Sequence, residues 1–135
     1  MHTIQRTRER KATEPTLGEE LAAFENGDVV EMTNLQEEDT GVPGVIFIST
    51  AMGSHGPRVK YFVKAGRNQP SFSVSIADEP AVLANSLPQR DLSRASQSVI
   101  AWVRLNKVAL LKFWNEGDGY SLREVVALVS SLKKV

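Results

Sequence analysis

The order of apolar and polar positions predicts little regular structure before residue 45. A Thr-x-x-Glu capping box predicts a short helix over residues 17–25, with Leu21 and Phe24 on one face and an Asn-Gly stop after it. Residues 29–32 have the composition of a short strand. The acidic, turn-rich stretch 33–44 is expected to be a loop.

From residue 45 the pattern becomes that of a sheet. Residues 45–48 are β-branched or aromatic and apolar on both faces, as in a central strand. Residues 58–63 and 71–77 alternate between apolar and polar positions, which is typical of strands with one buried face. Three successive strands with short loops predict an antiparallel meander, and Asp78-Glu-Pro80 is expected to end the sheet.

The C-terminal third has helical periodicity. A single helix is predicted from Pro88 to about Trp114, with a glycine-rich stop, and a second capping box predicts a last helix over residues 122–132. The apolar stripe of the longer helix consists of Leu92, Ala95, Val99, Trp102, Val103, Leu110 and Phe113. These faces are wide enough to cover one side of a small sheet.

Together these elements predict an α+β fold. We expect a small antiparallel sheet of three to four strands, with one face packed by two C-terminal helices, plus a short N-terminal helix. Residues 1–44 are expected to form an acidic N-terminal extension and residues 45–135 the compact α+β domain. The first 14 residues carry four bases and almost no apolar side chain, as in a flexible arm.

Charge is distributed unevenly although the formal net charge is zero. Residues 1–11 carry a net charge of +3, residues 12–57 carry nine acids and no Lys or Arg, and residues 58–135 carry twelve bases against six acids. Such asymmetry indicates a charged partner more directly than the total does.

Composition excludes several classes of site. The chain has no Cys, which rules out disulfides and thiolate metal sites, and its two His are far apart in sequence, so we expect no metal and no cofactor. The basic N-terminus is not followed by an apolar segment, and no apolar run approaches the roughly 20 residues that span a membrane. These features indicate a soluble, cytoplasmic, bacterial-type protein that does not bind membranes.

The polar face of the predicted hairpin is the main candidate site. If its two strands pair, Arg58, Lys60 and Phe62 share a face with three alternate serines, and Lys64 and Arg67 lie at the loop end. Cations with an aromatic ring and hydroxyl groups suit a phosphate backbone with stacked bases. The alternative is that this is the ordinary solvated face of a half-buried sheet.

Two further residues have a functional and a structural interpretation. His55 near Arg58 and Lys60 is the candidate catalytic residue of a toxin-like ribonuclease, but no orienting partner is apparent, and a loop histidine without a catalytic role fits equally. Asn106 interrupts the apolar stripe, so it either bonds neighbouring backbone or contacts a ligand.

The run from Val45 to Asn115 resembles a small uncharacterised bacterial family, a domain of unknown function often encoded near toxin–antitoxin-type genes. The resemblance covers about half of the chain and leaves out the acidic first 44 residues. It implies no catalytic residue, and this chain lacks the more histidine-rich motif of some relatives. The matching elements are His55-Gly-Pro-Arg-Val-Lys60, Phe72-Ser-Val-Ser-Ile76 with Asp78-Glu-Pro80, and Trp102-Val-Arg-Leu-Asn106 followed by Leu110-Leu-Lys-Phe-Trp-Asn115.

Three functions remain open at this stage. The first is a non-enzymatic binding module whose basic sheet face engages nucleic acid or an acidic protein. The second is a ribonuclease centred on His55, which the residues support less well than binding. The third is a structural or interaction protein that forms a homodimer. The acidic segment is expected to cover the basic face of the same chain, to cover the basic face of the other subunit in such a homodimer, or to serve only solubility.

Overall fold

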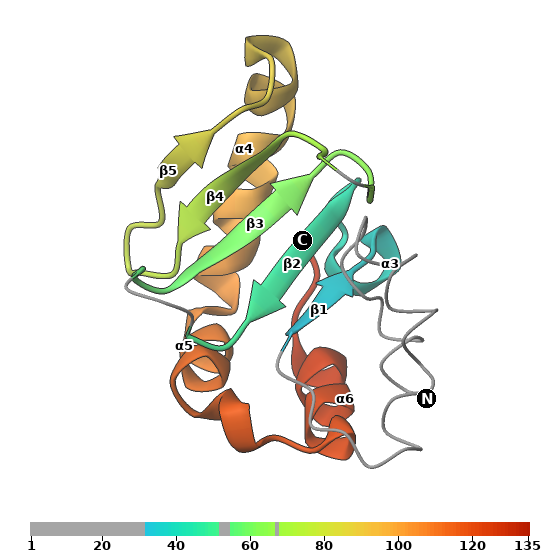
Figure 1. Ribbon diagram of the computed structural model, residues 1–135, viewed down its shortest axis with the longest axis vertical. Helices are drawn as coiled ribbons and strands as arrows, with labels where there is room; N and C mark the ends of the chain where they lie inside the picture. The colour runs from blue at the N-terminus through green and yellow to red at the C-terminus, as the bar shows by residue number, and fades with distance from the viewer. Residues whose placement is uncertain (1–31, 52–54, 67) are drawn as a thin grey trace.

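The computed structural model describes residues 32–51, 55–66 and 68–135. Within them the chain forms a five-stranded antiparallel sheet in which each strand pairs with the next along the chain (Figure 1). The strands are β1 (Met32–Leu35), β2 (Val45–Ser49), β3 (Arg58–Phe62), β4 (Ser71–Ser75) and β5 (Val82–Asn85). The α+β class and the antiparallel meander predicted from the sequence are confirmed.

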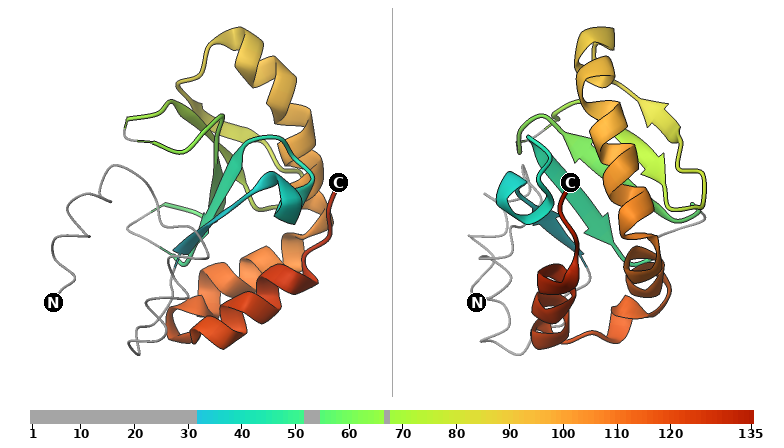
Figure 2. Two further views of the ribbon diagram at one scale, coloured as in Figure 1. Left: turned by 90° about the vertical axis from the view of Figure 1, so that its right-hand side faces the viewer. Right: turned by 180° about the vertical axis from the view of Figure 1, so that it is seen from behind.

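Helices pack on one side of this sheet. The short α3 (Glu37–Thr40) follows β1, and Figure 2 shows the three longer helices together on one side of the sheet. A 3₁₀ turn (Gly117–Gly119) joins the last two of them. The longer helices are α4 (Gln89–Leu105), α5 (Lys107–Glu116) and α6 (Leu122–Ser131).

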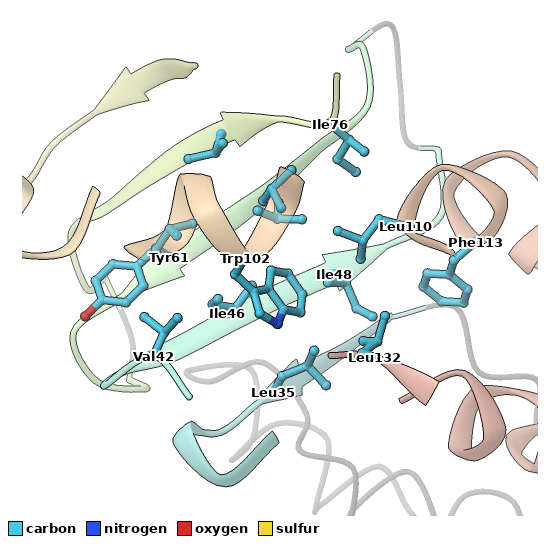
Figure 3. Close-up of a cluster of buried hydrophobic side chains, with 14 of the residues drawn as sticks. Leu35, Val42, Ile46, Ile48, Tyr61, Ile76, Trp102, Leu110, Phe113 and Leu132 are labelled. Atoms are coloured by element: carbon cyan, nitrogen blue, oxygen red, sulfur yellow. The ribbon is translucent and has the colours of Figure 1, made fainter. Parts of the chain in front are cut away.

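The core lies between the sheet and the helices. In the register of β3 and β4, Val59 is opposite Val74 and Tyr61 is opposite Phe72, and these four side chains are buried. Figure 3 shows Trp102 of α4 within this core, with Leu35, Ile46 and Ile48 around it. The alternation that predicted the strands therefore reflects one buried face, as expected.

Two strands lie outside the predicted sheet. β1 occupies residues 32–35, where a strand over 29–32 and then a loop were expected; residues 29–31 lie outside the described residues. Thr33 and Asn34 are buried although polar, so hydropathy gave no signal that a strand continues beyond Met32. β5 follows Asp78-Glu-Pro80, where the sheet was expected to end, and its side chains are largely exposed, as at a sheet edge. Where three to four strands were expected, the described residues form five.

The expected boundary between residues 44 and 45 falls inside this sheet. β1 pairs with β2 from Met32↔Ser49 to Leu35↔Ile46, and Leu35 and Val42 belong to the hydrophobic core. Residues 32–44 are therefore structurally part of the compact domain. The predicted N-terminal helix and flexible arm lie outside the described residues.

The predicted long helix is interrupted at Asn106. Its buried amide donates from Nδ2 to the carbonyls of Trp102 (3.0 Å) and Lys133 (2.9 Å), and Oδ1 accepts from the Lys133 N–H at 2.8 Å. A side-chain amide that bonds backbone competes with helical pairing, which accounts for the break between α4 and α5. The same bonds hold the C-terminal tail, whose last amide, of Val135, donates to the Thr40 carbonyl at 2.9 Å.

The last helix is confirmed as predicted. The Ser121 hydroxyl accepts from the Glu124 N–H at 3.3 Å, and the Glu124 carboxylate accepts from the Ser121 N–H at 2.8 Å. This reciprocal capping box begins α6 at Leu122 and satisfies two backbone donors that the helix leaves unpaired.

Candidate functional site

The pairing of β3 with β4 brings the predicted site residues together. Arg58 lies opposite Ser75, Lys60 opposite Ser73 and Phe62 opposite Ser71. Because neighbouring residues of a strand point to opposite faces, all six lie on the side away from α4, which we call the outer face. The conditional prediction that these side chains share one face is therefore correct.

The outer face extends onto β1 and β2. Register places Phe47 beside Lys60 and Val45 beside Phe62, with Asn34 beside Phe47 on the other side. The sequence identified residues 45–48 as apolar on both faces but did not say which of them would adjoin the basic residues. Strand register, which is set by the fold, supplies this second aromatic ring next to Lys60.

Exposure divides the outer face into two halves. In the β1–β2 half, Asn34, Val45, Phe47 and Ser49 are only 2%, 5%, 5% and 7% exposed. In the β3–β4 half Lys60 is exposed and Arg58, Phe62, Ser71 and Ser75 are half-buried, while Ser73 is buried. Accessible charge on the outer face is thus concentrated on β3.

The cations of the β3–β4 half are available for a ligand. Among the described residues neither Lys60 nor Lys64 is in an ion pair, and Arg58 makes one bond, from Nε to the Gly56 carbonyl at 3.3 Å. Lys64 is exposed just beyond β3. The Ser75 hydroxyl accepts from the Ala81 N–H at 3.0 Å, so it is partly committed to the turn before β5. Arg67 lies outside the described residues.

His55 and Asn106 are not joined to this site by the described contacts. His55 is exposed in the loop before β3 and, within the described ranges, makes no hydrogen bond to a carboxylate or any other side chain. The ribonuclease hypothesis therefore gains no orienting partner from these residues. Both amide protons of Asn106 and its oxygen bond to backbone, on the helix side of the sheet, which favours its structural interpretation.

A separate hollow of about 220 Å³ lies on the helix side, between the end of β3 and α4. The Tyr61 hydroxyl donates to the Pro43 carbonyl at 2.6 Å in its wall. Burial, and secondly the negative charge of Asp91, raise the pKa of Tyr61. The fold alone assembles this hollow from distant segments, and no sequence spacing predicts it. It is lined by Val42, Pro43, Gly44, Tyr61, Val63, Asp91, Arg94, Ala95 and Ser98.

The described residues contain no cluster of three or more His, Asp or Glu side chains that could hold a metal ion. In the same part of the chain, no helix has both the length and the apolar character that crossing a membrane requires.

The described residues thus form an α+β domain with helices on one side of a five-stranded antiparallel meander and a partly basic outer face. Comparison with protein family models, with curated proteins and with solved structures finds no match.

Proposed function

We propose that the chain is a non-catalytic binding module whose β3–β4 half binds a single-stranded polynucleotide. The observation that carries this proposal is the position of Lys60. It is exposed and unpaired among the described residues, and it lies between Arg58 and Phe62 on a sheet face that no described helix covers.

The spacing on β3 supports a polyanion with planar groups. Alternate residues of a strand lie about 7 Å apart on one face, so Arg58, Lys60 and Phe62 form a short row of two cations and an aromatic ring. Cations attract phosphates without regard to sequence, and an aromatic ring beside them provides a surface on which a base stacks. The Ser71 and Ser73 hydroxyls flank Phe62 and Lys60 across the hairpin as additional hydrogen-bonding groups.

Fluorescence anisotropy with a labelled single-stranded RNA and a DNA oligonucleotide of the same length tests the charge component. Arg58→Glu with Lys60→Glu is expected to weaken binding strongly, so that it remains measurable only at low salt. Loss of two phosphate contacts also reduces the slope of log K against log salt by about 1.4. The matched control is Arg104→Glu with Lys112→Glu, which changes net charge equally at exposed positions of α4 and α5 and should leave affinity nearly unchanged.

The aromatic component is tested separately by Phe62→Leu, which keeps an apolar side chain but removes the ring. Base stacking is worth about 1–3 kcal/mol, so affinity should fall at least several-fold while the salt slope stays the same. Equal weakening by the two charge-reversed pairs would refute a local site. If the oligonucleotides do not bind but poly-glutamate does, with no effect of Phe62→Leu, the partner is an acidic protein and the polynucleotide proposal is wrong.

A further inference from the structure

We infer that the hollow on the helix side of the sheet binds a small aliphatic amino acid as a zwitterion. Two oppositely charged side chains of α4, Asp91 and Arg94, line this hollow together with apolar groups. The inference goes beyond the proposed function, because it assigns a second site on the other side of the sheet. The hollow shares no side chain with the row of Arg58, Lys60 and Phe62.

The size of the hollow limits its occupant to a small molecule. Sites for drug-sized ligands measure about 300–1,000 Å³, whereas this hollow measures about 220 Å³. It therefore suits a molecule of amino-acid size better than a nucleotide. Val63 and Arg94 are exposed where they line it, so a ligand can enter from solvent without opening the core.

One wall of the hollow is mainly apolar and is held in place by the fold. Figure 3 shows Tyr61 beside Val42 at one end of the core, and these side chains are 5% and 1% exposed. The Tyr61 hydroxyl donates to the Pro43 carbonyl at 2.6 Å. Gly44 has φ +112°, and a Cβ added there would meet the Tyr61 ring, so the ring lies directly against the Gly44 backbone. A wall fixed in this way needs little rearrangement when a ligand binds.

The opposite wall carries polar groups in a fixed order along α4. Asp91, Arg94 and Ser98 lie at i, i+3 and i+7, so they share one face of the helix about a turn apart. Among the described residues neither Asp91 nor Arg94 is in an ion pair, and no side-chain hydrogen bond involves either of them or Ser98. The Asp91 charge acts on the opposite wall, since it contributes to the raised pKa of Tyr61.

This arrangement matches a ligand that carries both charges on neighbouring atoms. The ammonium group of an amino acid would donate to Asp91, and its carboxylate would accept from the Arg94 guanidinium and the Ser98 hydroxyl. Its aliphatic side chain would then face the apolar wall. A ligand with only one charge leaves either Asp91 or Arg94 facing the hollow without a counter-charge, which makes the zwitterion the better fit.

Two-dimensional NMR of the full chain with L-leucine at millimolar concentration tests the inference. The amide signals of Tyr61, Val63 and Ala95 should shift on titration, while that of Val125 in α6 should not. Isoamylamine lacks the carboxylate and isocaproic acid lacks the ammonium group, so each should bind about tenfold or more weakly than L-leucine. Glycine, which lacks the aliphatic side chain, should be weakened by at least about tenfold as well.

Charge-removing variants assign the two ends of the ligand. Arg94→Gln should weaken L-leucine about tenfold without weakening isoamylamine, and Asp91→Asn should weaken both of these without weakening isocaproic acid. The matched control is Arg90→Gln, which removes the same charge at an exposed position of α4 outside the hollow and should change no affinity. The ligand comparison in the parent chain requires no variant, so it decides the matter even if a substitution disturbs the fold.

Three results overturn the inference. The first is the absence of shifts around the hollow with L-leucine at millimolar concentration. The second is binding of isoamylamine or isocaproic acid as tight as that of L-leucine, which would show that the two charges do not act together. The third is an equal effect of Arg94→Gln and Arg90→Gln on L-leucine. None of these measurements contains an oligonucleotide, so they stand whether or not the polynucleotide proposal holds.

Discussion

Replacing Asn106 by Ala should destabilise the fold strongly, because a single side chain ties the α4–α5 junction to the C-terminal tail. The substitution removes three hydrogen bonds, two to Lys133 and one to the Trp102 carbonyl, at a residue that is 6% exposed. The backbone N–H of Asn106 keeps its own bonds to Trp102 and Val103. The loss is therefore confined to the side chain.

The magnitude follows from the number of bonds. Each is worth about 1 kcal/mol net, so the free energy of unfolding should fall by about 3 kcal/mol. With a urea slope of about 2 kcal/mol per M, the unfolding midpoint should drop by about 1.5 M. Asn115→Ala is the matched control, because Asn115 is exposed on α5 and should change the midpoint very little.

Hydrogen exchange locates the effect. The Lys133 amide, which donates to Asn106, should lose protection in Asn106→Ala, while amides in β3 change only by the drop in global stability. Asn106→Asp keeps the acceptor for Lys133 but buries a carboxyl group, whose pKa burial raises. Its stability should therefore fall as pH rises through that pKa. An unchanged urea midpoint for Asn106→Ala, with Lys133 still protected, would refute the structural role and restore a ligand contact as the alternative.

Three further substitutions test contacts elsewhere in the fold. Tyr61→Phe should cost about 1 kcal/mol of unfolding free energy. It should also remove the share of the alkaline loss of stability that Tyr61 causes. Burial raises the Tyr61 pKa above 10.0, so the stabilising neutral phenol is lost only as pH rises through the folded-state value. Urea unfolding between pH 8 and 11 checks both. Gly41→Ala should lower the free energy of unfolding by more than about 1 kcal/mol, since Gly41 has φ +82° and an added Cβ meets the Val135 backbone. A urea midpoint equal to that of the wild type would contradict this. Lys107→Met should raise the pKa of Asp78, which the Lys107 hydrogen bond and charge now lower, so NMR should show the Asp78 carboxyl titrating at higher pH. The small stability that the Asp78–Lys107 pair contributes is present above pH 3.8 and is lost as pH falls.

Hydropathy predicted the parts of the fold in which alternation or helical spacing reflects burial. The strands around Val59 and Val74, the α6 cap and the side on which helices pack follow from such patterns. β1 and β5 do not, because buried Thr33 is polar and most of β5 is exposed. The break at Asn106 depends on a bond to residue 133, a partner that local sequence does not reveal.

The sequence likewise predicted those parts of the candidate site that depend on alternation within a strand. Once β3 and β4 pair, side-chain parity alone puts Arg58, Lys60 and Phe62 with the serines on one face. The neighbouring Phe47 and the hollow beside Tyr61 depend on register between strands and on how α4 crosses the sheet, which no local pattern encodes. Local sequence thus predicts the members of the basic row but not the apolar surface beside it.

Charge is distributed unevenly across the described strands, and this favours one path for a polyanion over the β3–β4 half. The acids Glu37 and Glu38 are exposed on α3, which adjoins β1, while β3 carries the cations and β5 has no charged residue. A polyanion that crosses β1 meets the carboxylates of α3. Over β5 the strand itself carries no charge, and the acids nearest to it in sequence are Asp78, which is paired with Lys107, and Glu79 in the preceding turn. Because exposed charges act over roughly 10 Å at ordinary ionic strength, this difference operates across the width of two strands. A polynucleotide bound at Lys60 should therefore extend over β4 and β5, away from α3.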